Sequence, residues 1–218
     1  MTRNRVDISL PIIPAPEGHR GIFGRLHIIQ HFFLQELTML IRKFFGLLAM
    51  LLLTGSVCAL EPKTGPVIKD YGPVYDVPEG AWNLDGDTHY KVSMDVSATG
   101  DFSSDLNRRI ESAARFLNLH ARNGIDQKNI EFAIVVHGPA GKDLLKDTAY
   151  EARFDEPNPN TSMLNALHSA GVKIYLCGQT AAYRGYAVEE LNPAVSLALS
   201  AMTAHVRLQS EGFTLIPF

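Results

Sequence analysis

The chain has 218 residues, of which 46% are hydrophobic and 20% charged, and its formal net charge is −3. These values are near globular averages, so they exclude a largely disordered chain and a polytopic membrane protein. The acidic balance offers no basic surface for phosphates, so we expect no nucleic-acid partner. The length favours one domain with a continuous core.

The N-terminal part contains a pattern typical of a secretory signal peptide. Residues 39–43 form a short basic start, residues 44–53 are apolar except for Gly46, and residues 56–59 are mostly small, as at a cleavage site. We therefore interpret residues 39–59 as a signal peptide that starts at Met39. Residues 1–38 are then a non-structural upstream extension.

Two alternatives to cleavage stay open. The uncharged stretch 44–60 could serve as an uncleaved anchor, although it is at the short limit of the roughly 20 residues that span a bilayer. Lipid attachment through Cys58 is the weaker alternative, because the preceding Val57 is bulkier than the small residue usually found there. With cleavage, we expect a periplasmic protein with no stable membrane span in the mature chain.

Removal of residues 1–59 changes both the charge and the cysteine content. That segment holds six basic and three acidic residues, so the mature chain has a net charge of about −6. It also holds Cys58, one of the two cysteines. Cys177 is then the only thiol, and no intramolecular disulfide can form. A lone thiol in an oxidising compartment escapes oxidation only if it is buried or used in chemistry.

Residues 60–87 precede the regular part of the chain. They are rich in Pro, Gly and Asp and carry Tyr71, Tyr75 and Trp82. This composition predicts an extended arm in front of a domain at residues 88–218. The aromatic residues favour packing across that domain or onto a neighbouring subunit, and a locally packed loop is the alternative.

From residue 88 onward, apolar periodicity predicts alternating strands and helices. Alternation predicts a half-buried strand at 89–96, and a continuous apolar run predicts a strand covered on both faces at 130–136. Between them, apolar residues at three- and four-residue steps predict a helix from Leu106 to Ala121, which ends at Asn123-Gly124. Its predicted N-cap is Asp101, Ser103 or Ser104.

The second half of the domain continues the pattern. We predict helices at 142–150 and 161–170 and a strand at 172–176. A longer helix is predicted from Pro193 to Gly212, and a last strand at 213–216. The predicted long helix buries one face, made of Val195, Leu199, Met202 and Val206. Strands separated by helices indicate an α/β domain with a mainly parallel sheet and right-handed crossovers.

Two chemically capable side chains follow predicted strands. Cys177 stands where a strand ends and a helix begins, and His137 follows the strand at 130–136. Carboxyl ends of parallel strands open on one crevice, so the two side chains lie close together if their strands are neighbours. Helix N–H groups favour the thiolate, and His137 could pair with it or shuttle its proton. The alternatives are a buried, inert Cys177 and a His137 that only bonds turn backbone.

Backbone N–H groups near these residues predict a small anion pocket. Gly138 and Ala140 lie in a loop before a helix, Gly178 and Gln179 begin the helix after the thiol, and Arg184 could add a cation. The loop has neither P-loop nor dinucleotide spacing, so we expect no nucleotide and no other cofactor. Scattered histidines and one cysteine do not build a metal site, and no Gly-x-Ser-x-Gly elbow occurs.

Four segments resemble a known family. The cysteine segment at 174–185 is similar to the Cys-x-x-x-Ala-x-x-Arg-Gly segment of DsrE/DsrF-like proteins. The segments 118–120, 135–140 and 198–203 also look like the exported branch of that family. The resemblance covers about residues 88–218, and the cysteine segment is its most specific part.

This resemblance implies a flavodoxin-like α/β subunit that assembles into trimers or hexamers. It also implies that Cys177 accepts sulfane sulfur as a persulfide and passes it on, as a sulfur carrier or sulfurtransferase. Sulfur-relay members of the family are cytoplasmic and use dedicated partner subunits, whereas this chain carries an export signal, so donor and acceptor stay open. The alternative function is a non-catalytic oligomeric binding module with a silent cysteine.

Overall fold

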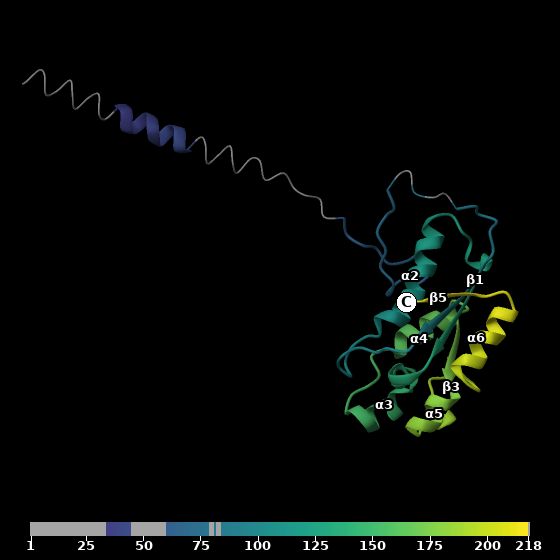
Figure 1. Cartoon of the computed structure of the whole chain (residues 1–218). Helices are drawn as coiled ribbons and strands as arrows, with labels where there is room; N and C mark the ends of the chain where they lie inside the picture. Colours follow the sequence, from purple (N-terminus) through teal and green to yellow (C-terminus); the bar gives the residue numbers. More distant parts are fainter. Residues whose placement is uncertain (1–33, 45–59, 79–80, 82–83, 218) are drawn as a thin grey trace, which may run out of the picture. The chain divides into compact units, whose positions relative to one another are not determined.

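The computed structural model describes residues 34–44, 60–78, 81 and 84–217 (Figure 1). The chain divides into two units, residues 1–59 and residues 60–218. In the first unit, residues 34–44 are helical with exposed side chains. The apolar run from residue 45 and the predicted cleavage site lie outside the described residues. Among the helices that are described, none is long and apolar enough to cross a membrane.

The second unit is built on a five-stranded sheet in which all paired strands are parallel. The strand order is β4-β3-β2-β1-β5. The strands are β1 (Tyr90–Val96), β2 (Ile130–Val136), β3 (Lys173–Cys177), β4 (Val195–Ala198) and β5 (Thr214–Pro217). The predicted flavodoxin-like α/β class with a mainly parallel sheet is confirmed.

Helices and short 3-10 turns connect these strands. They are α2 (Arg108–Arg122), η1 (Gln127–Asn129), η2 (Gly138–Leu144), α3 (Asp147–Phe154), α4 (Thr161–Ser169), α5 (Gly178–Arg184), η3 (Val188–Glu190) and α6 (Ala201–Ser210). From β1 to β4 the chain steps across the sheet in one direction. It then returns over the whole sheet through α6 to place β5 beside β1. Right-handed crossovers therefore put α6 on the face opposite the other helices.

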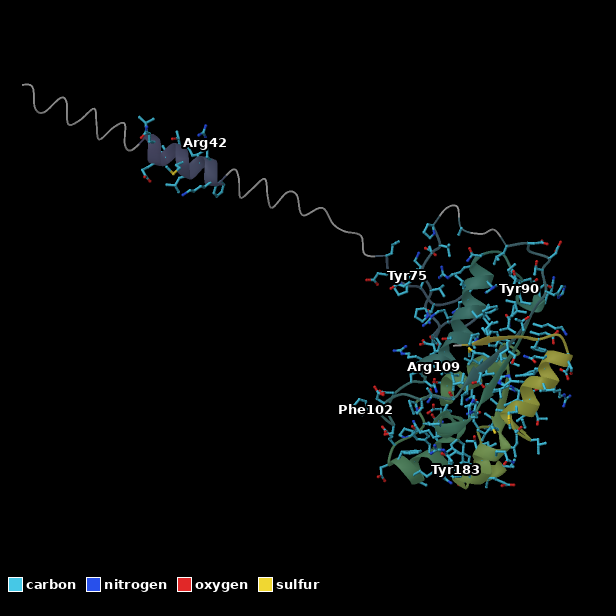
Figure 2. The ribbon with its side chains drawn as sticks, in the orientation of Figure 1. Arg42, Tyr75, Tyr90, Phe102, Arg109 and Tyr183 are labelled. Atoms are coloured by element: carbon cyan, nitrogen blue, oxygen red, sulfur yellow. The ribbon has the colours of Figure 1, made fainter. Side chains whose placement is uncertain are left out.

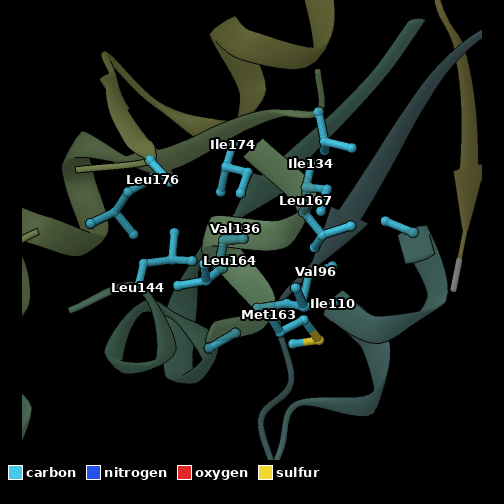
Figure 3. Packing of buried hydrophobic residues seen from close by; sticks show 14 of the residues in the cluster. Val96, Ile110, Ile134, Val136, Leu144, Met163, Leu164, Leu167, Ile174 and Leu176 are labelled. Atoms are coloured by element: carbon cyan, nitrogen blue, oxygen red, sulfur yellow. The ribbon is translucent and has the colours of Figure 1, made fainter. Parts of the chain in front are cut away.

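The two faces of the sheet carry cores of different size. The larger core joins alternate strand residues such as Val136 and Leu176 to α2 and α4, through side chains such as Ile110 and Leu167 (Figure 3). The smaller core contains only five buried residues: Ala133, Val135, Ala204, Leu208 and Phe213. The opposite face is thus covered thinly, by α6 and the turn after it (Figure 1).

The described part of the arm, residues 60–78, belongs to the same compact unit as the sheet. Ile68 and Val74 are 3% and 4% exposed. The side chain of the fully buried Asn118 in α2 bonds the arm backbone, and the Tyr71 hydroxyl contacts Ser162 of α4. Tyr75 is 58% exposed (Figure 2), and Trp82 lies outside the described residues. The arm therefore packs on the helical layer of its own domain.

Two predicted boundaries on the helical face are wrong. The N-cap of α2 is Asn107, whose Oδ1 accepts from the N–H groups of Arg109 and Ile110 at 3.0 and 3.2 Å. The predicted helix at 142–150 is divided into η2 and α3. The division occurs at Leu145, which is extended, and the Asn158 side chain bonds its carbonyl at 2.6 Å.

The predicted helix from Pro193 is also wrong at its start. Residues Val195–Ala198 form β4, because the edge of β3 offers them a complete parallel ladder. α6 begins only at Ala201, after the N-cap Ser200. Of the apolar residues that the helix was expected to bury, Val195 lies in β4 and is partly buried. The other three are exposed on the surface: Leu199, Met202 and Val206, at 74%, 77% and 68%.

Candidate functional site

Cys177 is the last residue of β3 and the N-cap of α5, at the strand-to-helix junction predicted from the sequence. Its neighbour in the sheet is Ala198 of β4. The residue is 6% exposed, and it is the only free cysteine within the described part of the chain. The thiol is therefore largely shielded at the carboxyl edge of the sheet.

Gly178 allows the backbone to close tightly around the thiol. A Cβ atom at this position would lie 2.6 Å from the carbonyl oxygen of Ala198 and 2.9 Å from that of Leu199. Both contacts are with backbone, which cannot move aside as a flexible side chain could. The absent side chain thus lets the β4–α6 connection lie directly against the start of α5, beside Cys177.

Replacing Gly178 with Ala is expected to push the β4–α6 connection away from the thiol. Overpacking of this kind typically costs about 1–3 kcal/mol of unfolding free energy. Urea unfolding would measure the cost. Gly171→Ala is not a suitable control, because Gly171 has a positive φ of 87°, which alanine rarely adopts. The solvent-exposed Ala182→Gly in α5 is the control for helix propensity, at about 1 kcal/mol. A Gly178→Ala protein as stable as wild type would contradict the close packing.

The surroundings of Cys177 lower the pKa of its thiol. Burial raises this pKa, but the N–H groups of Thr180, Ala201 and Gln179 and the Thr180 hydroxyl favour the thiolate and more than offset it. Ala201 begins α6, so two helix N-termini face the same sulfur.

Thr180 joins the thiol to the loop after β2. Its Oγ1 accepts a hydrogen bond from the Gly138 N–H at 2.9 Å. The Ala140 N–H donates to the carbonyl of Ser97 at 3.2 Å. These two N–H groups were expected to be unpaired and to bind an anion. That expectation is wrong, because the loop uses both to hold its own shape.

Gln179 and Arg184 fall at different distances from the thiol. Gln179 is in the first turn of α5, and its N–H is among the groups that favour the thiolate. Arg184 is the last residue of α5 and is exposed. Seven residues of helix separate it from Cys177 by about 10 Å along the axis. A cation at Arg184 beside the sulfur, which the sequence suggested, stays a prediction.

His137 follows β2, which is the immediate neighbour of β3. The ladder between the two strands ends at Val136 and Leu176, one residue before His137 and Cys177. Because Val136 and Leu176 both enter the larger core, the next residue on each strand starts from the opposite face, the face of α6. The His137 ring binds Asp95 of β1, with 3.1 Å between Nε2 and Oδ2.

Sequence reasoning missed the partners of His137. Asp95 also binds His205 of α6, with 2.8 Å between Oδ1 and Nε2, and His205 Nδ1 lies 3.2 Å from the hydroxyl of Ser93. We name these four residues the Asp95 cluster. Burial raises the pKa of Asp95, but hydrogen bonds from His205 and His137 outweigh this effect and leave the pKa below its ordinary value. The sequence did hold a signal for this cluster: polar residues alternate along β1, although the sheet is covered on both faces.

The donor set at this edge does not resemble a metal centre. In the residues that the structure describes, no three or more His, Cys, Asp or Glu side chains gather in a way that could hold a metal ion. Asp95 is engaged by two imidazoles, and the thiol is surrounded by N–H and O–H donors. The arrangement suits a stabilised sulfur anion next to a hydrogen-bonded pair of histidines.

Comparisons with known proteins found a family and similar solved structures. The profile of the "DsrE/DsrF-like family" matches residues 91–218, more than half of the chain. Two solved structures are similar: the protein of unknown function MTH1491 from Methanobacterium thermoautotrophicum, with 20% identity and a TM-score of 0.45, and the ychN protein from E. coli, with 16% and 0.43. Each similarity covers 59% of this chain and 99% of the other. A search of curated proteins found no match.

Proposed function

We propose a sulfur-carrier function for this chain, which belongs to the DsrE/DsrF-like family. Membership indicates a protein related to sulfur relay. The finer proposal is that the protein binds or transfers sulfane sulfur as a persulfide on Cys177, which makes it a possible sulfurtransferase. The observation that carries this proposal is the thiol of lowered pKa, placed between the N-termini of α5 and α6.

The chemistry requires a thiolate and a way to stabilise the product. The Cys177 thiolate attacks a sulfane sulfur of a polysulfide, the S–S bond in the donor breaks, and the departing polysulfide takes the electron pair. The product is a persulfide anion, and no outside oxidant or reductant is needed. A second nucleophile then attacks the outer sulfur and releases the Cys177 thiolate. The N–H groups that favour the thiolate lie where they would also face the persulfide charge.

His137 has a supporting role in this proposal. Asp95 accepts a hydrogen bond from Nε2 and so favours the tautomer with its proton there. Nδ1 is then the nitrogen able to take or give a proton at the carboxyl edge of the sheet. His137 and Cys177 follow neighbouring strands, which lie about 4.8 Å apart, and this supports Nδ1 as a base near the sulfur. We propose that it exchanges protons with the thiol or with the second nucleophile.

We further propose that the mature protein is periplasmic and self-associates as a trimer or hexamer. The compact unit begins at Leu60, directly after the predicted cleavage site, which supports removal of residues 39–59 with the signal peptide. Exposed apolar side chains gather on α6 and at its start, namely Leu199, Met202 and Val206, and Tyr183 of α5 is 87% exposed (Figure 2). Such surfaces are typical of subunit contacts.

Mass spectrometry of the exported protein tests these proposals. After incubation with inorganic polysulfide, we expect a mass increase of about 32 Da, one sulfur atom, on the peptide that contains Cys177. Alkylation over a pH series should give a thiol midpoint below that of a free cysteine. The native spectrum of the same sample reports the mature N-terminus and the number of subunits. A Cys177 peptide without added sulfur would overturn the carrier function.

The 6% exposure of Cys177 favours one alternative, a non-catalytic oligomeric module with a silent cysteine. This alternative predicts slow alkylation at every pH and no sulfur uptake. A small, linear polysulfide needs much less access than an alkylating reagent. Uptake of sulfur together with slow alkylation would therefore support a carrier with a narrow entrance over a silent module.

A further inference from the structure

The Asp95 cluster lies on the same face of the sheet as the thiol and reaches the edge beside it only at His137, yet it does not touch the sulfur in any described contact. Its members come from three segments far apart in the sequence: Ser93 and Asp95 from β1, His137 from the end of β2, and His205 from α6. Ser93 is fully buried, and the His205 side chain is 15% exposed. One carboxylate on β1 thus binds two imidazoles, one from the end of β2 and one from α6.

α6 buries few side chains of its own, so this polar contact adds to its attachment to the sheet. Only Ala204 and Leu208 of the helix are buried, and its outward side chains include Met202 and Val206. Among the described side-chain hydrogen bonds of α6, those of His205 alone reach the sheet. The remaining ones are local, such as Arg207 to Glu211. His205 is therefore the side chain of α6 that joins the helix to the sheet by hydrogen bonds, in addition to the packing of Ala204 and Leu208.

That position matters to the thiol through Ala201. Ala201 and His205 are four residues apart, so they lie on the same side of α6, one turn from each other. The Ala201 N–H is one of the groups that favour the Cys177 thiolate. On the other side of Asp95, His137 leads directly into Gly138, whose N–H binds the Thr180 hydroxyl oxygen. Both elements that Asp95 holds therefore carry or orient donors around Cys177.

We propose that Asp95 and His205 are positioning residues for the thiol: their hydrogen bond fixes α6 so that the Ala201 N–H faces the sulfur of Cys177. This inference rests on the proposed use of the Cys177 thiolate. Hydrogen-bond donation falls off steeply with distance and angle, so a small shift of α6 weakens the donor at the sulfur. Burial of the thiol, which acts in the opposite direction, changes little in such a shift.

The test is the pH midpoint of Cys177 alkylation in the mature protein. His205→Leu removes both nitrogens, and we expect the midpoint to rise by about one pH unit, a roughly tenfold loss of thiolate at neutral pH. His205→Gln keeps an N–H near the position of Nε2 and should restore most of the wild-type midpoint. His168→Leu, an exposed histidine in α4, is the matched control and should not move it.

An unchanged or lowered midpoint in His205→Leu would overturn the proposal, because the hydrogen bond from the Ala201 N–H to the sulfur would then not depend on His205. If the leucine variant does not fold, His205→Asn replaces it, since its amide lies near Nδ1 and cannot reach Asp95 as Gln does. Equal midpoints for the Gln and Asn variants would also overturn it. The titration uses no sulfur donor, so its result is separate from success or failure of sulfur loading.

Discussion

We expect the Cys177→Ser protein to take up no sulfur from polysulfide, whereas wild type gains about 32 Da per loaded subunit. A serine hydroxyl has nearly the size of the thiol, but it stays protonated at neutral pH and is not a nucleophile toward sulfane sulfur. The fold should persist, because the N–H groups that face the sulfur can donate hydrogen bonds to the serine oxygen and leave it satisfied. Intact mass spectrometry measures the uptake, and thermal unfolding checks the fold.

Cys58→Ser in the full chain is the matched control, because it removes the only other cysteine. It should load sulfur as wild type does. Thr180→Val gives an intermediate case: it keeps the shape but removes the hydroxyl that favours the thiolate and accepts from Gly138. We expect it to load more slowly. Equal loading of wild type and Cys177→Ser would show that sulfur binds elsewhere and would refute the persulfide on Cys177.

The sequence predicted the centre of the sheet better than its edge. Residues 130–136 are continuously apolar because β2 is covered on both faces, and that pattern identifies the strand exactly. β4 has only four residues, and its sequence fits a helix as well as a strand. Leu199, Met202 and Val206 have helical spacing but are exposed. Spacing alone does not tell an apolar face that enters the core from one that remains on the surface.

In the candidate site, too, one part could be predicted from the sequence and another could not. The position of Cys177 depends on local order along the chain, namely a strand, a glycine and a helix, so it could be read from the sequence. The contact between Asp95 and His205 joins residues 110 apart and exists because the chain returns across the sheet through α6. Local sequence patterns do not predict where such a return brings two distant residues together. The Gly138 loop was misjudged for a related reason, since its N–H partner Thr180 comes from another crossover.

Asn118→Ala is expected to give the largest loss of stability outside the thiol site. The buried Asn118 side chain accepts from the N–H groups of Val67 and Ile68 at 3.1 and 2.8 Å. It donates to the carbonyls of Ile68, Tyr71 and Gly72 at 2.9–3.0 Å. Each buried group left unpaired costs about 1–3 kcal/mol, so we expect a total loss of about 3–5 kcal/mol. Urea unfolding measures the loss.

Asn123→Ala at the end of the same helix is the control, because the Asn123 side chain is exposed and makes only a local bond to Leu119. It should cost less than about 1 kcal/mol. Limited proteolysis adds a second readout: the arm at 60–78 should be cleaved early in Asn118→Ala and late in the control. The arm packs on α2, across the sheet from α6, so the alkylation midpoint of Cys177 should stay unchanged. A loss below about 1 kcal/mol in Asn118→Ala would show that the arm adds little to the fold.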